Sequence, residues 1–374
     1  MYWSNPTTRS GQFTMTTVSL RTAFESTGDA NNGYHSASFV KFCNSLASFR
    51  DRVEARYAGA VYPVGTALAG KEFNPENGGV GLYSSDVLIP AFLSTYTNMG
   101  GNSLDIFPTL ARLLPNWTIR YSGLSKLSPF KDLFKSGNLN HSYKSVFAIG
   151  SYSSYSSWIE YMGDLGFIAD ATTGMPTPNS MFNISTVSIN ESFSPLIGID
   201  VTLNNNLTCK VEYKTTRVVN LSTTSVQINE TTSKDLVLGF GYKINDFKFF
   251  GLGGHRKVKG AKKKGGEEDE NKSNQSRSTS KNNSKNFNHD LNLRCDVSFR
   301  KQANITRDIA SMTSQASSGN SAFKFSFNAD YTISKLMTMT FYYDSQTNTP
   351  LLSSSSYPTT TRDFGFSLKF SLTR

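Results

Sequence analysis

Apolar and polar residues alternate along most of this chain, and the alternation predicts β-strands. Every second residue is apolar within 196–203, 207–213, 234–244, 290–299 and 322–333. A period of two places successive side chains on opposite faces of a strand. The first two runs form the clearest hairpin, because three asparagines, which favour turns, separate them. About eleven or twelve strands are expected along the chain, and the predicted fold class is all-β.

One region departs from this period and predicts helices. Residues 36–57 carry apolar side chains at spacings of three and four, which is typical of an amphipathic helix, and 84–96 also favour a short helix. We therefore expect 31–114 to form a helical loop or cap between a strand in 1–30 and further strands in 115–253. The segment could act as a cap or a plug. The favoured interpretation is a packed loop domain without chemistry of its own.

Composition and charge add two expectations. Hydrophobic residues make up only 37% of the chain, but aromatic residues reach 13%, which suits strands with one wet and one apolar face. The net charge of +10 would usually suggest nucleic acid, but residues 255–288 hold ten basic and four acidic side chains, a local excess of 10 − 4 = +6. Residues 254–289 lack the apolar side chains of a core and are predicted to be a disordered basic loop. No nucleic-acid partner is expected.

The sequence predicts no enzyme, cofactor or metal site. The three cysteines, Cys43, Cys209 and Cys295, are odd in number and widely spaced, and the four histidines are scattered. We find no phosphate-binding glycine loop and no nucleophile elbow. No apolar stretch approaches the length of a transmembrane helix, and no signal peptide is visible at the start of the sequence.

Two physical settings produce repeated strands of this kind. A soluble sandwich buries the apolar face against a second sheet, whereas a membrane barrel turns it toward lipid and keeps a polar lumen. Charged residues in the middle of strands, apolar segments of about nine to eleven residues, and alternating short turns and long loops favour a transmembrane barrel. The predicted lipid-facing residues are Leu236, Leu238, Phe240, Tyr242, Phe323, Phe325, Phe327, Phe364 and Phe366. The predicted lumen-facing residues are Lys210, Glu212, Lys243, Arg294, Asp296, Lys324 and Lys369.

The last strand of the region 290–374 has the spacing of a barrel-insertion signal. Such a signal has a polar residue, a glycine two positions on, and two later apolar residues at alternating positions. Asp363, Gly365, Leu368 and Phe370 fit this spacing, although the final residue, Arg374, is not aromatic. A closing strand must also pair with the first strand, because an open sheet edge in lipid leaves backbone groups without hydrogen bonds. Since such a barrel must be exported and no export signal is visible, we expect the chain to be the C-terminal part of a longer protein.

Several segments resemble one known family. They are SSDVLIPAFLSTY (84–96), LPNWTIRYSGLSKL (114–127), SPLIGIDVTLNNNLTCKVEYKTTR (194–217), LVLGFGYKI (236–244) and SYPTTTRDFGFSLKFSLTR (356–374). These segments are similar to the C-terminal region of the SprA (Sov) family. Its members are very large outer-membrane translocons of the type IX secretion system in the Bacteroidota, and many are linked to gliding motility. The resemblance covers most of the chain except the basic loop.

The resemblance implies a barrel of about 36 strands, to which this chain would contribute roughly a third. Barrel diameter grows with strand number, so folded proteins would fit the lumen. The implied partners are outer-membrane lipid, cargo proteins with a C-terminal secretion domain, and the carrier β-barrel and plug proteins of the system. The implied location is the outer membrane.

Two alternatives remain open at this point. The chain could be a self-contained outer-membrane porin or transporter of about twelve strands. It could also be a soluble secreted β-sandwich adhesin, for which the four Asn-x-Ser/Thr triplets at Asn183, Asn190, Asn206 and Asn220 offer weak support.

Overall fold

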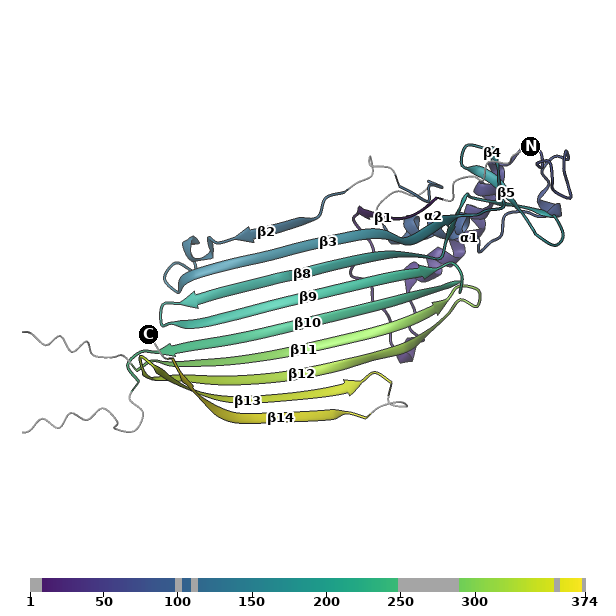
Figure 1. Cartoon of the computed structure of the whole chain (residues 1–374). Helices are drawn as coiled ribbons and strands as arrows, with labels where there is room; N and C mark the ends of the chain where they lie inside the picture. The colour runs from purple at the N-terminus through teal and green to yellow at the C-terminus, as the bar shows by residue number, and fades with distance from the viewer. Residues whose placement is uncertain (1–8, 98–102, 109–113, 248–288, 353–356, 372–374) are drawn as a thin grey trace, which may run out of the picture.

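The computed structural model describes residues 9–97, 103–108, 114–247, 289–352 and 357–371 and consists mainly of one long antiparallel sheet (Figure 1). The helices are α1 (Ala37–Ala55) and α2 (Ser85–Tyr96), with 3-10 turns at Ala30–Asn32, Pro75–Asn77 and Leu124–Lys126. The strands are β1 (Ser10–Thr16), β2 (Trp117–Tyr121), β3 (Phe134–Ser154), β4 (Trp158–Met162), β5 (Leu165–Ala169), β6 (Pro176–Asn179), β7 (Phe182–Ile184), β8 (Thr186–Leu203), β9 (Leu207–Ser222), β10 (Gln227–Ile244), β11 (Leu291–Asp308), β12 (Thr313–Ser334), β13 (Met337–Pro350) and β14 (Thr359–Phe370).

The large sheet is antiparallel and open. Its strands follow the order β1-β3-β8-β9-β10-β11-β12-β13-β14, while β2 and β7 also pair with β3. The sheet therefore contains eleven strands but is nine strands wide in the described residues. The predicted all-β antiparallel class is confirmed at this level. Because β1 and β14 lie at opposite edges and do not pair, the described sheet is not a closed barrel.

The first edge of the sheet is a single strand position split by a long insertion. β1 pairs with β3 from Val146 to Ser153, and β2 pairs with the same strand from Leu139 to Tyr143. The two strands thus lie in line, and the chain leaves the sheet after Thr16 and returns at Trp117. The strand expected in 1–30 is therefore shorter, and the inserted segment begins earlier than 31. We call residues 17–97 the cap.

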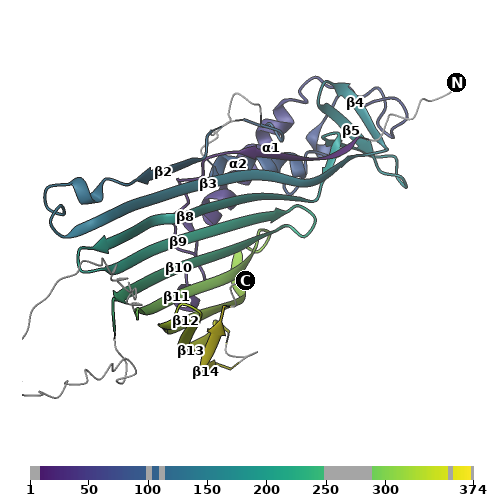
Figure 2. The same ribbon diagram turned by 60° about the vertical axis from the view of Figure 1, so that its left-hand side comes forward.

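The cap contains the two expected helices. Ser36 caps the N-terminus of α1, because its hydroxyl oxygen accepts a hydrogen bond from the Phe39 amide (3.2 Å). Phe39, Phe42 and Leu46 recur at helical spacing and are at most 3% exposed. Figures 1 and 2 place both helices beside one end of the large sheet. There they bury apolar side chains of β3, β8, β9 and β10 in one common core.

A small separate sheet interrupts the region 115–253. β4, β5 and β6 form a three-stranded sheet, so the expectation that this whole region belongs to the barrel wall is wrong for these strands. Phe167 explains their position. Its ring lies 5.3 Å from that of Tyr57 and 5.4 Å from that of Tyr62, and it is fully buried against the cap. The small sheet therefore packs against the cap and shares its hydrophobic core.

Loop lengths do not alternate between the two ends of the large sheet as predicted. The short turns at 204–206 and 335–336 lie at the same end of the sheet as the last residue of β10 and the first residue of β11, because β8, β10 and β12 run in the same direction. The opposite end carries the turn 223–226 and the cap. The lengths of the connections alone do not predict which end of the sheet each connection lies at. That depends on the direction of the strand before each connection and on where the cap is inserted. The predicted disorder of 254–289 lies outside the described residues, apart from His289.

Candidate functional site

The residues predicted to face lipid share one face of the sheet. A row crosses five strands on that face: Phe240, Cys295, Phe327, Tyr343 and Phe364 are successive cross-strand partners. The same registers place all nine predicted lipid-facing residues on this face. We call the following residues the apolar band: Ile197, Ile199, Val201, Val211, Tyr213, Leu236, Leu238, Phe240, Tyr242, Leu291, Leu293, Val297, Phe299, Phe323, Phe325, Phe327, Phe341, Tyr343, Phe364, Phe366, Leu368 and Phe370.

The apolar band is not covered by the described chain. Phe240 is 45% exposed, and at the edge strand Phe364 and Phe366 are 75% and 77% exposed. Single exposed apolar residues are common on proteins, but a continuous apolar surface across seven strands marks an interaction with a membrane or a partner. The charged residues that were predicted to face a lumen all lie on the other side.

The opposite face of the same strands is polar. A row of cross-strand partners runs from Lys210 through Gly239, Asp296 and Ser326 to Asp344. All seven predicted lumen-facing residues lie on this polar face. The contacts with lipid and with a lumen themselves remain predictions.

Ion pairs cover part of the polar face. Lys210 and Lys214 each contact a carboxylate oxygen of Glu212 at 3.2 Å, and Arg300 binds Asp235 at 3.0 Å. The cationic members of these pairs are between 37% and 57% exposed. Exposed ion pairs stabilise a protein little, and their charged groups remain hydrated. The polar face is therefore suited to contact with water.

The four insertion-signal residues lie in the edge strand β14. Asp363 and Gly365 are on the polar face, and Leu368 lies with Phe370 on the band. The glycine has a local reason. It is the cross-strand partner of Tyr342, and an added Cβ would lie 2.7 Å from the tyrosine hydroxyl oxygen. The tyrosine ring thus covers the bare backbone of the edge strand. That these four residues act as an insertion signal remains a prediction.

The cap lies on the same face as the apolar band. β10 alternates without interruption from Ile228 to Ile244, so the fully buried Ile228 and the exposed Phe240 point to one side. On that side, the Arg307 guanidinium lies 5.7 Å from the ring of Phe39 in α1. Each long strand therefore has two halves on this face, one under the cap and one in the band.

A buried ion-pair network joins the cap to the sheet and was not predicted from the sequence. Glu230 binds Arg217 at 2.7 Å and Arg307 at 2.8 Å, and all three are at most 6% exposed. The arginines also reach the cap backbone. Arg217 donates to the carbonyl of Thr22 at 2.6 Å, and Arg307 donates to that of Tyr34 at 2.5 Å. These three charged residues stand at positions of β9, β10 and β11 where apolar residues would be expected, which is a signal visible in the sequence. Only the pairing register of the strands shows that the three side chains meet.

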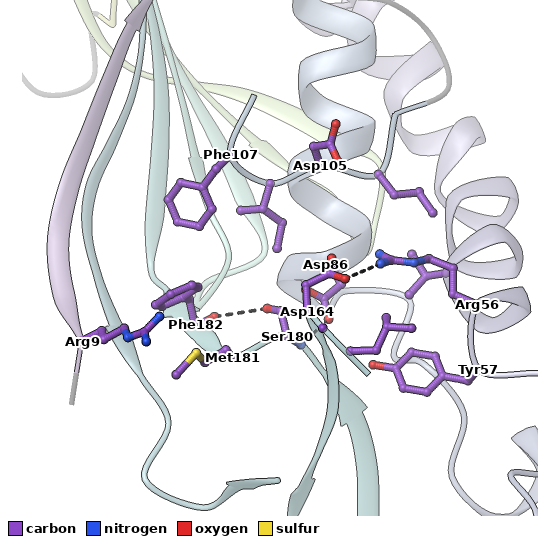
Figure 3. Close-up of a pocket in the computed structure, with 15 residues that line it drawn as sticks. Arg9, Arg56, Tyr57, Asp86, Asp105, Phe107, Asp164, Ser180, Met181 and Phe182 are labelled. Atoms are coloured by element: carbon purple, nitrogen blue, oxygen red, sulfur yellow. Dashed lines mark hydrogen bonds and ion pairs between the residues drawn. The ribbon is translucent and has the colours of Figure 1, made fainter. Parts of the chain in front are cut away.

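A cavity of about 390 Å³ lies between the cap and the small sheet (Figure 3). The Asp86 carboxylate accepts a hydrogen bond from the Ser180 amide at 2.7 Å, and burial raises the pKa of this carboxyl. Its second oxygen has no hydrogen-bond partner among the described residues, which a protonated carboxyl tolerates better than an ionised one. Arg56 and Asp164 form an ion pair of 2.6 Å at the cavity wall.

Comparison with known proteins adds no further assignment, because no family model and no curated protein matches this sequence. None of the helices in the described residues has the length and apolar character needed to cross a bilayer. Within those same residues, histidine, cysteine and acidic side chains do not gather in any group of three or more that could hold a metal ion.

Proposed function

We propose that this chain forms part of the wall of a wide outer-membrane β-barrel that conducts secreted proteins. The observation that carries the proposal is the apolar band, which lies on one face of seven adjacent strands and opposite a charged face. Lipid on one side and water on the other is the setting that this division suits. A soluble sandwich would need a second sheet over the band, and the described residues provide none there.

The open sheet favours a wall segment over a self-contained porin. Further strands would close the barrel between the β1 and β14 edges, since unpaired backbone groups in lipid cost several kcal/mol each, by rough estimate. A barrel of many strands has a lumen that admits folded proteins. The sequence resemblance to type IX translocons supports the same reading, with cargo carrying a C-terminal secretion domain as the transported partner.

The position of the cap supports a clear lumen. Because the cap and the apolar band share a face, a band that touches lipid puts the cap outside the barrel wall, just beyond the membrane. The cap would then not be a plug. The strands are long enough both to cross the membrane and to carry the cap beyond it. β10 and β11 have 18 residues each, about twice the nine to eleven that a tilted strand needs to cross the hydrocarbon.

Photo-crosslinking in the native outer membrane tests this proposal. A photoreactive amino acid at Lys210, on the polar face, is expected to capture secreted cargo during transport. The same group at Phe240, on the band, is expected to capture lipid and no cargo. The proposal fails if the protein does not co-fractionate with outer membranes, or if cargo is captured from the band and not from the polar face.

A further inference from the structure

A shallow cavity of about 290 Å³ lies at one end of the apolar band. Its floor is aromatic and aliphatic: the Phe299 and Phe323 rings are 4.9 Å apart, and Leu236 lies beside them. Its rim carries two exposed lysines, Lys234 and Lys301. All five residues lie on the band's face.

The two lysines are direct cross-strand partners on β10 and β11. Side chains in this relation have Cβ atoms about 5 Å apart, and like charges there destabilise a sheet. Neither ammonium group forms an ion pair with the described residues. The nearest charged pair along these strands, Asp235 with Arg300, lies on the opposite face and is already satisfied. The geometry therefore leaves a place for an anion that can contact both ammonium groups.

The cavity also marks a boundary along the strands. On one side of the cavity, the apolar rows of the band begin with Phe299 and Phe323. On the other side, along the same face, the next residues of β12 and β13 are Ser321 and Thr349, and β9 to β11 run under the cap. In a membrane protein this is the level of the lipid headgroups, where lysines extend from an apolar surface toward phosphate.

We propose that this cavity binds an anionic membrane lipid. Its phosphate lies between the ammonium groups of Lys234 and Lys301, and an acyl chain lies over Phe299 and Phe323. This inference rests on the proposed function, because it needs the band to face a bilayer. A phosphate without an acyl chain would use only the rim and leave the aromatic floor exposed.

Native mass spectrometry of the full chain, purified in a neutral detergent, tests the site. The probes are dioleoylphosphatidylglycerol and, for comparison, dioleoylphosphatidylcholine. The double variant Lys234→Ala/Lys301→Ala is expected to weaken phosphatidylglycerol binding by roughly tenfold or more, since lysines near a lipid surface attract anionic headgroups. The control Lys210→Ala/Lys243→Ala removes the same charge from the polar face and is expected to leave the affinity unchanged.

Three results would overturn the site. The two double variants could lose affinity equally, phosphatidylcholine could bind as tightly as phosphatidylglycerol, or inorganic phosphate at the lipid's concentration could displace the lipid. In each case the chain would still be embedded in detergent, so the proposed membrane role would survive. A chain that is monomeric and stable without detergent would instead refute the membrane role and the lipid site together.

Discussion

The two halves of β10 present the same kind of residue to the same side of the sheet, with opposite outcomes. Under the cap, Ile228 is fully buried, whereas in the band Phe240 is 45% exposed. The register is continuous between them, so neither a bulge nor a change of face accounts for the difference. The buried half also contains an ion-pair network, whereas the positions of β10 that belong to the band carry no charged side chain.

This comparison shows that alternation alone does not tell what covers an apolar face. The cap half behaves as the core of a water-soluble protein, with helices above the sheet and the buried charges of Glu230, Arg217 and Arg307 paired with one another. The band half has no protein above it in the described residues. The same period-two signal therefore predicts a strand in both halves, and only the tertiary packing distinguishes a protein core from a surface suited to lipid.

The largest effect is expected from removing the shared carboxylate of the cap half. Glu230→Ala removes the carboxylate that the two buried arginines, Arg217 and Arg307, share, and breaking a buried ion pair from one side typically costs about 3–5 kcal/mol. We expect the cap to separate from the sheet, which limited proteolysis and urea unfolding would detect. The control Glu212→Ala affects an ion pair whose lysines are exposed, and should change the free energy of unfolding by at most about 1 kcal/mol. Equal effects of the two variants would contradict the anchoring role of Glu230.

The next effect compares the two faces of the band half. Leu238→Arg puts a charge on the band and should destabilise the bilayer-inserted protein by about 2–4 kcal/mol. Its neighbour Val237 lies on the polar face, so Val237→Arg should cost much less. Urea unfolding from lipid vesicles measures both. A larger penalty for Val237→Arg would mean that the faces are assigned the wrong way round.

A smaller effect is expected at the edge of the band half. Gly365→Val places a side chain where the Tyr342 ring lies, and overpacking of this kind costs about 1–3 kcal/mol. Thermal unfolding in detergent should show the loss. Adding Tyr342→Ala to Gly365→Val removes the ring and should restore part of the lost stability. Without that recovery, the glycine would be required for a reason other than the ring, such as recognition by insertion machinery.

The smallest effect concerns the pH dependence of the cap. Burial raises the pKa of Asp86, so the native state holds this proton more tightly than the unfolded chain does. Its contribution to stability is present below the ordinary aspartate pKa and is lost as the pH rises through the raised value. Asp86→Asn should therefore unfold at a higher temperature than the unmodified protein at pH 8, and the gap should close near pH 4.

Asp170 supplies a control of the opposite sign. Hydrogen bonds from the Thr173 amide and hydroxyl, and from the Thr172 amide, lower the pKa of this exposed carboxyl. Its stabilising contribution is present at neutral pH and is lost as the pH falls through the lowered value. Asp170→Asn should thus lower the unfolding temperature at neutral pH and not at strongly acid pH. If both asparagine variants shifted the pH profile in the same direction, the buried state of Asp86 would be wrong.

Local patterns were sufficient for much of the fold. Period-two runs predicted most of the long strands, spacing of three and four residues predicted α1, and 84–96 was also predicted to be a short helix, as α2 is, because each of these patterns depends only on neighbours along the chain. Alternation also divided the predicted lipid-facing and lumen-facing residues between two faces, as the register does. These are the features that the chain encodes within a single element.

Long-range features could not be read in this way. The split strand position of β1 and β2 depends on both pairing with β3 across a long insertion. The side of the sheet occupied by the cap depends on partners such as Arg307 and Phe39, far apart in sequence. The cavity at Lys234 and Lys301 depends on the register of two strands joined by a long connection. Each requires a contact that no local period specifies.

Accessibility of nitroxide labels along β10 tests the central claim most directly. Each residue from 236 to 243 would be labelled in turn, in a cysteine-free background and in lipid vesicles, and probed with oxygen, which dissolves in lipid, and with a water-soluble nickel chelate. We predict that oxygen reaches positions 236, 238, 240 and 242 and that the chelate reaches 237, 239, 241 and 243. Access of the chelate to the first set, or shielding of that set from both reagents, would contradict contact between the apolar band and lipid.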